Sequence, residues 1–294
     1  MSDSGSMLAV PAARIPGLAA VLERLDTARR IALTTHVNAD GDAAGSEIAV
    51  AAWLATRDRD VRIINPTPFP AAFRYLVEDP QLVLDHGQSG ADRFLAAADL
   101  IFVLDTSEPG RLGRLARRIE GRDLAILDHH PPGPTALAGT GIQDPSACAT
   151  GELVYDLISH ARLADPWPRP VIEGLYAAIV TDTGSFRFAN TTPRTHAIAG
   201  DLLRRGIDPE AAYRRLFATM PYRRIQLLRT ALESLEVDPE YHLSWMTIRA
   251  ADMSDAGTTA EDLDGVVEFA RSVEGTEIAI LFRETADRAT KISF

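Results

Sequence analysis

The strongest constraint on the fold is an alternation, over the first 200 residues, of short apolar runs with segments of helical periodicity. Leu100–Leu104 and Leu124–Leu127 are apolar at every position, which is typical of strands buried on both faces of a parallel sheet. Because strand and helix patterns that alternate in this way indicate βαβ units, the sequence predicts an α/β fold with a mostly parallel, doubly wound sheet. The other expected elements are strands at Ile31–Thr35 and Val61–Ile64, helices at Ala43–Leu54 and Val171–Thr181, and a helix starting at Pro193 with Thr192 as its N-cap.

The pattern changes after Gly206, where we expect the first domain, residues 1–206, to end. Residues 207–236 are rich in arginine and favour helix, which predicts a helical linker. Residues 237–294 predict a second, smaller α+β domain, and the chain of 294 residues is long enough for two separate cores. The elements expected in this second domain are strands at His242–Ile248, Glu277–Arg283 and Thr290–Phe294, a helix at Thr259–Ser272 and a turn at Thr285–Asp287.

The composition limits the compartment. Cys148 is the only cysteine, which excludes a disulfide within the chain and indicates a reducing environment. No apolar run approaches the ~18 residues that a membrane span needs. Residues 1–8 lack a basic start followed by an apolar core, so no export signal is expected. These features predict a cytoplasmic protein that does not enter the membrane.

The charge balance limits the partners. The chain has 30 basic and 41 acidic residues, which gives a net charge of −11. Binding to long duplex nucleic acid depends on the neutralisation of many phosphates, so this balance argues against such a partner. It still allows a small anionic substrate that is held in one local positive pocket.

Four clusters of polar residues each follow an apolar strand or helix. They are His36-Val-Asn-Ala-Asp40-Gly-Asp42, Asp105, Asp128-His129-His130, and Asp182 with the Thr-Gly-Ser-Phe that follows it. Ligands of open α/β sheets bind beyond the carboxyl ends of the strands. The first three clusters follow predicted strands, and we therefore expect them to meet at one edge of the sheet.

Together these clusters supply five carboxylates and three imidazoles. So many carboxylates in one crevice would repel one another strongly unless cations neutralised them. Oxygen-rich ligands with a few imidazoles suit Mn²⁺ or Mg²⁺ better than a structural zinc. Two such ions ~3.5–4 Å apart, bridged by a carboxylate, are the standard device for in-line phosphoryl hydrolysis.

Each cluster taken alone has a simpler interpretation. An aspartate after a strand, such as Asp105, is commonly a turn former or a helix cap. The adjacent pair His129 and His130 is by itself more typical of a surface than of a metal site, and Asp182-Thr-Gly is a turn signal. The hypothesis of a metal site therefore depends on all four clusters occurring together, each at the end of an element.

The four clusters resemble motifs I to IV of the DHH phosphoesterase superfamily. The resemblance extends to their contexts, and it covers nearly the whole chain. Within the superfamily the sequence is similar to the nanoRNase branch, which comprises bifunctional oligoribonucleases and 3'-phosphoadenosine-5'-phosphate phosphatases. The contexts that carry this resemblance are Thr35 to Ser46, Val103 to Gly113, Ile126 to Pro131 and Thr181 to Thr192.

The resemblance implies a role for each residue. His36, Asp40 and Asp105 would hold one Mn²⁺, and Asp42, Asp105, His129 and Asp182 would hold the other, so that Asp105 bridges the two ions. His130 would contact the scissile phosphate, and Asp128 would orient a histidine. Arg187 is a candidate contact to the phosphate or base of the substrate, with a surface arginine as the alternative. Mg²⁺ or Co²⁺ could replace Mn²⁺.

The implied activity is hydrolysis of short single-stranded oligoribonucleotides to mononucleotides, and of 3'-phosphoadenosine 5'-phosphate to AMP. The alternatives within the same metal chemistry are a cyclic-dinucleotide phosphodiesterase and a manganese pyrophosphatase. A nucleotide-binding relic without efficient catalysis is the non-enzyme alternative. Homodimer formation is a further expectation that the sequence leaves open.

One feature departs from the family pattern. Members carry a C-terminal DHH-associated domain with a glycine-rich, GGGH-type loop that binds the substrate. Here Thr290–Phe294 resembles the strand before that loop, and the sequence then stops. We therefore expect a truncated substrate-binding domain, whether the sequence is incomplete or the protein is a shortened form.

Overall fold

The structure is a computed structural model that describes residues 7–85, 87–263, 265–285 and 289–294. It divides into two compact units, one up to Leu216 and one from Phe217. Two predictions fall partly outside the described residues. One is the absence of an export signal in residues 1–8, and the other is the turn at Thr285–Asp287. Among the described helices, none has both the length and the apolar character needed to cross a membrane.

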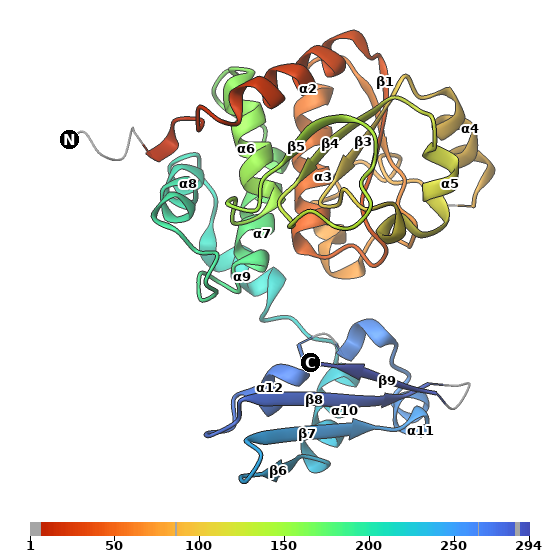
Figure 1. Cartoon of the computed structure of the whole chain (residues 1–294), viewed down its shortest axis with the longest axis vertical. Coiled ribbons are helices and arrows are strands. Elements are labelled where there is room, and N and C mark those ends of the chain that lie inside the picture. The colour runs from red at the N-terminus through yellow and green to blue at the C-terminus, as the bar shows by residue number, and fades with distance from the viewer. Residues whose placement is uncertain (1–6, 86, 264, 286–288) are drawn as a thin grey trace. The chain divides into compact units, whose positions relative to one another are not determined.

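The first unit is built on a five-stranded sheet, four strands of which are labelled in Figure 1. The strand order is β2-β1-β3-β4-β5, and every neighbouring pair is parallel. This arrangement confirms the predicted doubly wound, parallel sheet. The strands are β1 (Arg30–Thr34), β2 (Asp60–Ile63), β3 (Leu100–Leu104), β4 (Leu124–Asp128) and β5 (Thr140–Gln143).

Helices cover both faces of this sheet (Figure 1). One face carries α4 (Ser89–Ala97), the 3-10 turn η2 (Pro109–Leu115) and α5 (Ala116–Ile119), whose apolar side chains pack on β1, β3 and β4. The other face carries α2 (Ile15–Thr27), α3 (Gly41–Ala55) and α6 (Thr150–His160). The connection that follows β1 (α3) and the connection that follows β3 (η2 and α5) cover opposite faces of the sheet, so the topological switch point lies between these two strands.

Helix α7 (Arg169–Asp182) packs closely against α3. Two glycines allow this approach: a Cβ added to Gly45 would lie 2.3 Å from the carbonyl oxygen of Gly174. The N-terminus of α3 and the C-terminus of α7 each end in a predicted metal-binding cluster. The glycine contact therefore helps to fix the distance between Asp42 and Asp182.

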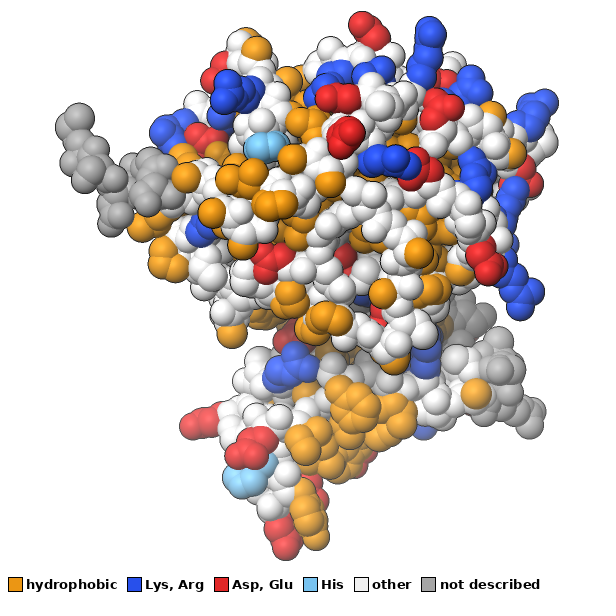
Figure 2. Space-filling view, turned by 45° about the horizontal axis from the view of Figure 1, so that its top comes forward, with side chains coloured by type: hydrophobic (Ala, Val, Ile, Leu, Met, Phe, Trp, Pro, Cys, Tyr) orange, Lys and Arg blue, Asp and Glu red, His pale blue; other side chains and the backbone are white. Residues whose placement is uncertain are grey.

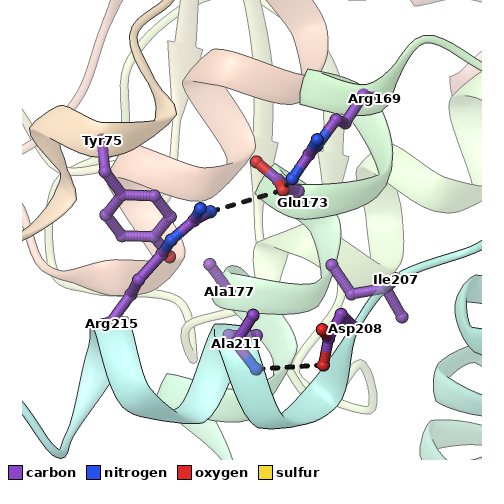
Figure 3. A pocket seen from close by; sticks show the side chains of 9 residues that line it. Tyr75, Arg169, Glu173, Ala177, Ile207, Asp208, Ala211 and Arg215 are labelled. Carbon is purple, nitrogen blue, oxygen red and sulfur yellow. Dashed lines mark hydrogen bonds and ion pairs between the residues drawn. The ribbon is translucent and has the colours of Figure 1, made fainter.

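The last helices of the first unit follow α7. Helix α8 (Pro193–Arg204) starts as predicted, with Thr192 as N-cap in a capping box with Thr195. Helix α9 (Pro209–Leu216) is held to α7 and to the 3-10 turn η1 (Ala71–Leu76) by Arg215, whose guanidinium lies 3.5 Å from Glu173 and over the ring of Tyr75 (Figure 3).

The second unit is a four-stranded sheet of order β6-β7-β8-β9, in which the central pair is parallel and the outer pairs are antiparallel. Residues 207–236, expected as a linker, are shared between the units, because α10 buries Leu227 and Ala231 in the core of the second. The elements are α10 (Tyr222–Glu233), β6 (Glu236–Asp238), β7 (Leu243–Ile248), α11 (Ala250–Asp255), η3 (Ala260–Leu263), α12 (Val267–Arg271), β8 (Ile278–Glu284) and β9 (Thr290–Ser293).

One predicted helix is wrong. The segment Thr259–Ser272, expected as a single helix, forms two short ones, η3 and α12. Gly265 lies between them with a φ of +73°, a left-handed conformation that a continuous right-handed helix excludes. Apolar side chains of this segment, such as Leu263 and Ala270, pack into the core of the second unit, but they belong to two separate helices.

Candidate metal centre

The carboxyl ends of three adjacent strands bring the polar clusters together. His36 follows β1, Asp105 follows β3, and Asp128 ends β4 with His129 and His130 next. These strands are neighbours in the sheet and lie on both sides of the switch point, where α/β sheets bind ligands. The clusters thus converge where the sequence predicted.

His36, Asp40 and Asp105 form a first group of ligand atoms. The Nε2 atom of His36 lies 3.2 Å from Asp105 Oδ2 and 3.8 Å from Asp40 Oδ2. Its Nδ1 atom lies 2.9 Å from the carbonyl oxygen of Val37, which can only accept, so we assign a proton to Nδ1. In a neutral His36 the lone pair of Nε2 then faces two carboxylates, an arrangement that a cation between them would satisfy.

Asp42, His129 and Asp182 form a second group. His129 Nε2 lies 3.7 Å from Asp42 Oδ2, 3.8 Å from Asp182 Oδ2 and 3.5 Å from Asp105 Oδ1. All three distances exceed a hydrogen bond, and this buried nitrogen has no hydrogen-bond partner among the described residues. A buried polar atom without a partner is rare, and a shared cation would account for it.

Asp105 belongs to the first group and also forms a third group with His129 and His130, and His129 links this third group to the second. One of its carboxylate oxygens faces His36 and the other faces His129. Its backbone has a φ of +61°, a strained conformation for a residue that is not glycine. The Thr150 hydroxyl donates to Asp105 Oδ1 at 3.0 Å and so fixes the carboxylate between the two groups.

The N-terminus of α6 holds Asp42. The backbone N–H groups of Thr150 and Gly151 donate to its carboxylate at 2.6 and 2.8 Å, and the Ser46 hydroxyl donates at 3.2 Å. The carboxylate thereby satisfies helix N–H groups for which α6 has no side-chain cap of its own. The sequence pattern did not indicate this role of Thr150 and Gly151, because Asp42 lies 108 and 109 residues away from them along the chain.

Two other supports are local. Asp40 is the N-cap of α3 and accepts from the N–H groups of Asp42 and Ala43, which leaves its second oxygen facing His36. The Asn190 amide donates to Asp182 Oδ2 at 3.1 Å and to the carbonyl oxygen of Cys148 at 2.8 Å. Asn190 lies within the motif context that ends at Thr192, so the sequence contained a signal for it.

The electrostatics of the cluster favour positive charge. Burial, followed by repulsion from neighbouring carboxylates, raises the pKa values of Asp42 and Asp105 well above the ordinary range. Burial also raises the pKa of Asp182, although His129 opposes it. These three carboxylates can all be ionised at neutral pH only when cations compensate them.

Asp128 and His130 form a separate pair. Asp128 Oδ1 lies 2.8 Å from His130 Nδ1 and accepts from the His130 backbone N–H at 3.0 Å. Burial raises the pKa of Asp128, but hydrogen bonds from His130 and Ser107 outweigh it and hold this pKa below its ordinary value. His130 is about one-third exposed and lies 3.6 Å from Asp105, so its free side can meet a substrate.

Arg187 lies in the segment that follows Asp182. It is exposed, and its Nε donates to the carbonyl oxygen of Gly184 at 2.6 Å. The donor set as a whole consists of carboxylate oxygens and imidazole nitrogens. This chemistry fits divalent ions such as Mn²⁺ or Mg²⁺, and the partnerless His129 nitrogen supports that fit.

Comparison with known proteins agrees with this geometry. A sequence model described as the DHH family, N-terminal domain, matches residues 30–179, which is more than half of the chain and includes most of the centre. This chain belongs to the DHH family. The matched region contains both α3 and α6, the helices that hold Asp42.

This DHH protein has named relatives. It is 30% identical over 267 residues to the bifunctional oligoribonuclease and PAP phosphatase NrnA of Thermus thermophilus, a match that covers 90% of this chain and 75% of the relative. It is 25% identical over 261 residues to the Bacillus subtilis protein of the same name, covering 88% and 79%. The family and these relatives place the chain among hydrolases that act on phosphate esters.

The fold has a close counterpart among solved structures. An exopolyphosphatase-related protein from Bacteroides fragilis superposes with a TM-score of 0.86 at 24% identity, covering 95% of this chain and 82% of that one. At this identity the likeness establishes the fold.

Proposed function

We propose that this DHH protein is a cytoplasmic, manganese-dependent hydrolase with two ions, which converts short oligoribonucleotides to mononucleotides and 3'-phosphoadenosine 5'-phosphate to AMP. The observation that carries the proposal is the position of Asp105, which faces His36 with one oxygen and His129 with the other. A single buried carboxylate shared by two ligand groups is the arrangement that a pair of bridged ions needs.

In this proposal His36, Asp40 and Asp105 hold one ion, and Asp42, Asp105, His129 and Asp182 hold the other. When bound, the ions would neutralise the phosphate charge and activate water for in-line attack. Residues around the ions would position the ligands and the substrate contact. Thr150 and Gly151 hold Asp42 in place, and Asp128 orients His130. His130 contacts the scissile phosphate, where its imidazole stabilises charge or assists the leaving group.

The names of the relatives support the choice of substrate. The surface is consistent with a short substrate. Figure 2 shows acidic and basic side chains interspersed over the upper part of the view, with no continuous basic track on that face. A net charge of −11 is consistent with a substrate that is bound chiefly through the metal centre.

The test is hydrolysis by the purified full chain with Mn²⁺. We expect release of mononucleotides from a diribonucleotide and of phosphate from 3'-phosphoadenosine 5'-phosphate, and loss of both products in Asp105→Ala. A matched surface variant, Asp92→Asn, should keep full activity, because the one ion pair of Asp92 among the described residues is with Arg118, and both side chains are partly exposed. Retained nucleotide binding without any product in the parent protein would overturn the proposal and favour a binding relic.

A further inference from the structure

A tightly wound loop, residues 183–191, follows the metal-ligand candidate Asp182. Gly184, Ser185 and Phe186 have φ values of +54°, +59° and +66°. Three successive residues in the left-handed region are costly, because two of them carry side chains. Backbone strain of this kind persists only where the surroundings impose it, and it is found mainly at functional sites.

Hydrogen bonds hold the loop rigidly in this shape. The carbonyl oxygen of Thr183 accepts from the N–H groups of Arg187 and Phe188 at 2.9 and 3.0 Å. The Thr183 hydroxyl accepts from the Phe186 N–H at 3.1 Å, and the Phe186 ring stacks on His196 of α8 at a centroid distance of 5.0 Å. The loop is therefore anchored at its start and by one of its two aromatic side chains.

The other aromatic side chain, Phe188, points outward. The tip of its ring lies against Gly184, where an added Cβ would come within 2.5 Å of the Phe188 Cζ atom. Although the tip of its ring is covered, Phe188 as a whole residue is 51% exposed. An aromatic ring that is fixed in position and yet half exposed has its remaining apolar surface available to a ligand.

The loop is tied directly to the metal centre. The backbone N–H of Phe188 donates a hydrogen bond to the carbonyl oxygen of Thr183, the residue next to Asp182. At the other end of the loop, the Asn190 amide donates to the Asp182 carboxylate. Any movement of the ring is thus limited by the same bonds that hold a candidate metal ligand.

We propose that Phe188 is the platform on which a nucleobase of the substrate stacks, and that it determines a preference for nucleotides over base-free phosphate esters. This inference rests on the proposed function, because it assigns the base of the same substrate. Stacking is tolerant of sequence, since every base presents a π face, so one platform serves oligonucleotides of any composition.

The experiment uses the full chain and a diribonucleotide in which both bases are 2-aminopurine, whose fluorescence is quenched when it stacks. We expect the parent protein to quench the probe on binding, Phe188→Ala to lose most of this quenching, and Phe188→Tyr to restore it. For hydrolysis of the same probe, Phe188→Ala should raise KM by roughly 5- to 30-fold and leave kcat unchanged. Leu203→Ala, at an exposed position on α8, is the matched control and should behave like the parent.

A dinucleotide of abasic sites separates stacking from folding. Phe188→Ala should hydrolyse it as fast as the parent does; an equal loss on both substrates, or quenching that survives in Phe188→Ala, would overturn the inference. If the parent quenches the probe through Phe188 but releases no product, the proposed function fails and the platform stands. If it cleaves the probe with no dependence on Phe188, the function stands and the platform fails.

Discussion

The carboxylate of Asp42 lies 3.7 Å from Nε2 of His129, although the first residue belongs to the start of α3 and the second follows β4. Asp42 is 1% exposed and is held by backbone N–H groups, while the His129 nitrogen has no hydrogen-bond partner among the described residues. This geometry agrees with our proposal that the two side chains are ligands of one ion.

The first prediction concerns Asp42→Asn. The amide replaces one carboxylate oxygen by an NH₂ group, so it cannot accept from both Thr150 and Gly151 and still ligate an ion. We expect bound manganese to fall from two ions per chain to one, and hydrolysis to fall by at least about 100-fold. Elemental analysis of the dialysed protein, next to a kinetic assay, measures both; two ions retained in the variant would refute the assignment.

The second prediction concerns the pH dependence of stability without metal. Burial raises the pKa values of Asp42 and Asp105, and it raises that of Glu47, beneath the centre, to about 8. A carboxyl whose pKa is higher in the folded state binds more protons when folded, so the free energy of unfolding falls as pH rises from the ordinary carboxyl range through the folded value. For Glu47 this window ends at about pH 8. The metal-free protein should therefore melt at a lower temperature at pH 8 than at pH 5.5.

Added Mn²⁺ should reverse this trend, since the ions replace protons in the ligand groups and bind more tightly at higher pH. The variant Glu47→Gln separates the effect of Glu47 on stability from the effect of the candidate ligands Asp42 and Asp105. The amide that replaces the Glu47 carboxyl group can still accept from Asn65 but never ionises, so this variant should be more stable than the parent at pH 8 and should keep its response to Mn²⁺. A parent melting temperature that rises steadily from pH 5.5 to 8 without metal would contradict the account.

The third prediction compares two arginines. Arg14 is 4% exposed and lies 2.7 Å from each of Asp144, Glu152 and Asp156. Arg14→Ala should lower the free energy of unfolding by about 3–5 kcal/mol, because it leaves the buried carboxylates of Glu152 and Asp156 with Arg194 as their one remaining ion-pair partner among the described residues. Arg24→Ala removes an ion pair with Asp123 that is exposed to solvent, so it should lower the free energy of unfolding far less than Arg14→Ala does. Urea denaturation measures the free energy of unfolding of both variants, and an equal loss of stability in the two would contradict this prediction.

The fourth prediction concerns the contact between α3 and α7. The methyl group of Gly45→Ala would meet backbone atoms of Gly174 and Ala178, so the helices must separate. We expect a loss of about 1–3 kcal/mol of stability together with weaker metal binding, since α3 carries Asp42. Gly200→Ala is the matched control in α8, where nothing lies within 4 Å, and a gain of about 0.4–1 kcal/mol is expected there. A Gly45→Ala protein that melts and binds Mn²⁺ like its parent would exclude this role.

The sequence alone predicted which side chains converge, because long-range order here follows from local signals. The fully apolar runs at β3 and β4 located two buried strands, and parallel strands have their carboxyl ends at the same edge. Strand β5 was missed, because its TGIQ segment is a partly exposed edge strand without an apolar run. Nothing in the local pattern indicated that Asp42 caps α6, since this contact depends on the tertiary fold. That the converged groups bind two ions stays a prediction.

The most direct test is the anomalous scattering of manganese in crystals of the full chain grown with Mn²⁺. We predict two peaks roughly 3.5–4 Å apart, one beside His36 and Asp40 and one beside Asp42 and His129, with the Asp105 carboxylate contacting both. A single peak, or peaks that leave Asp105 without a metal contact, would contradict the claim that one aspartate bridges two ions.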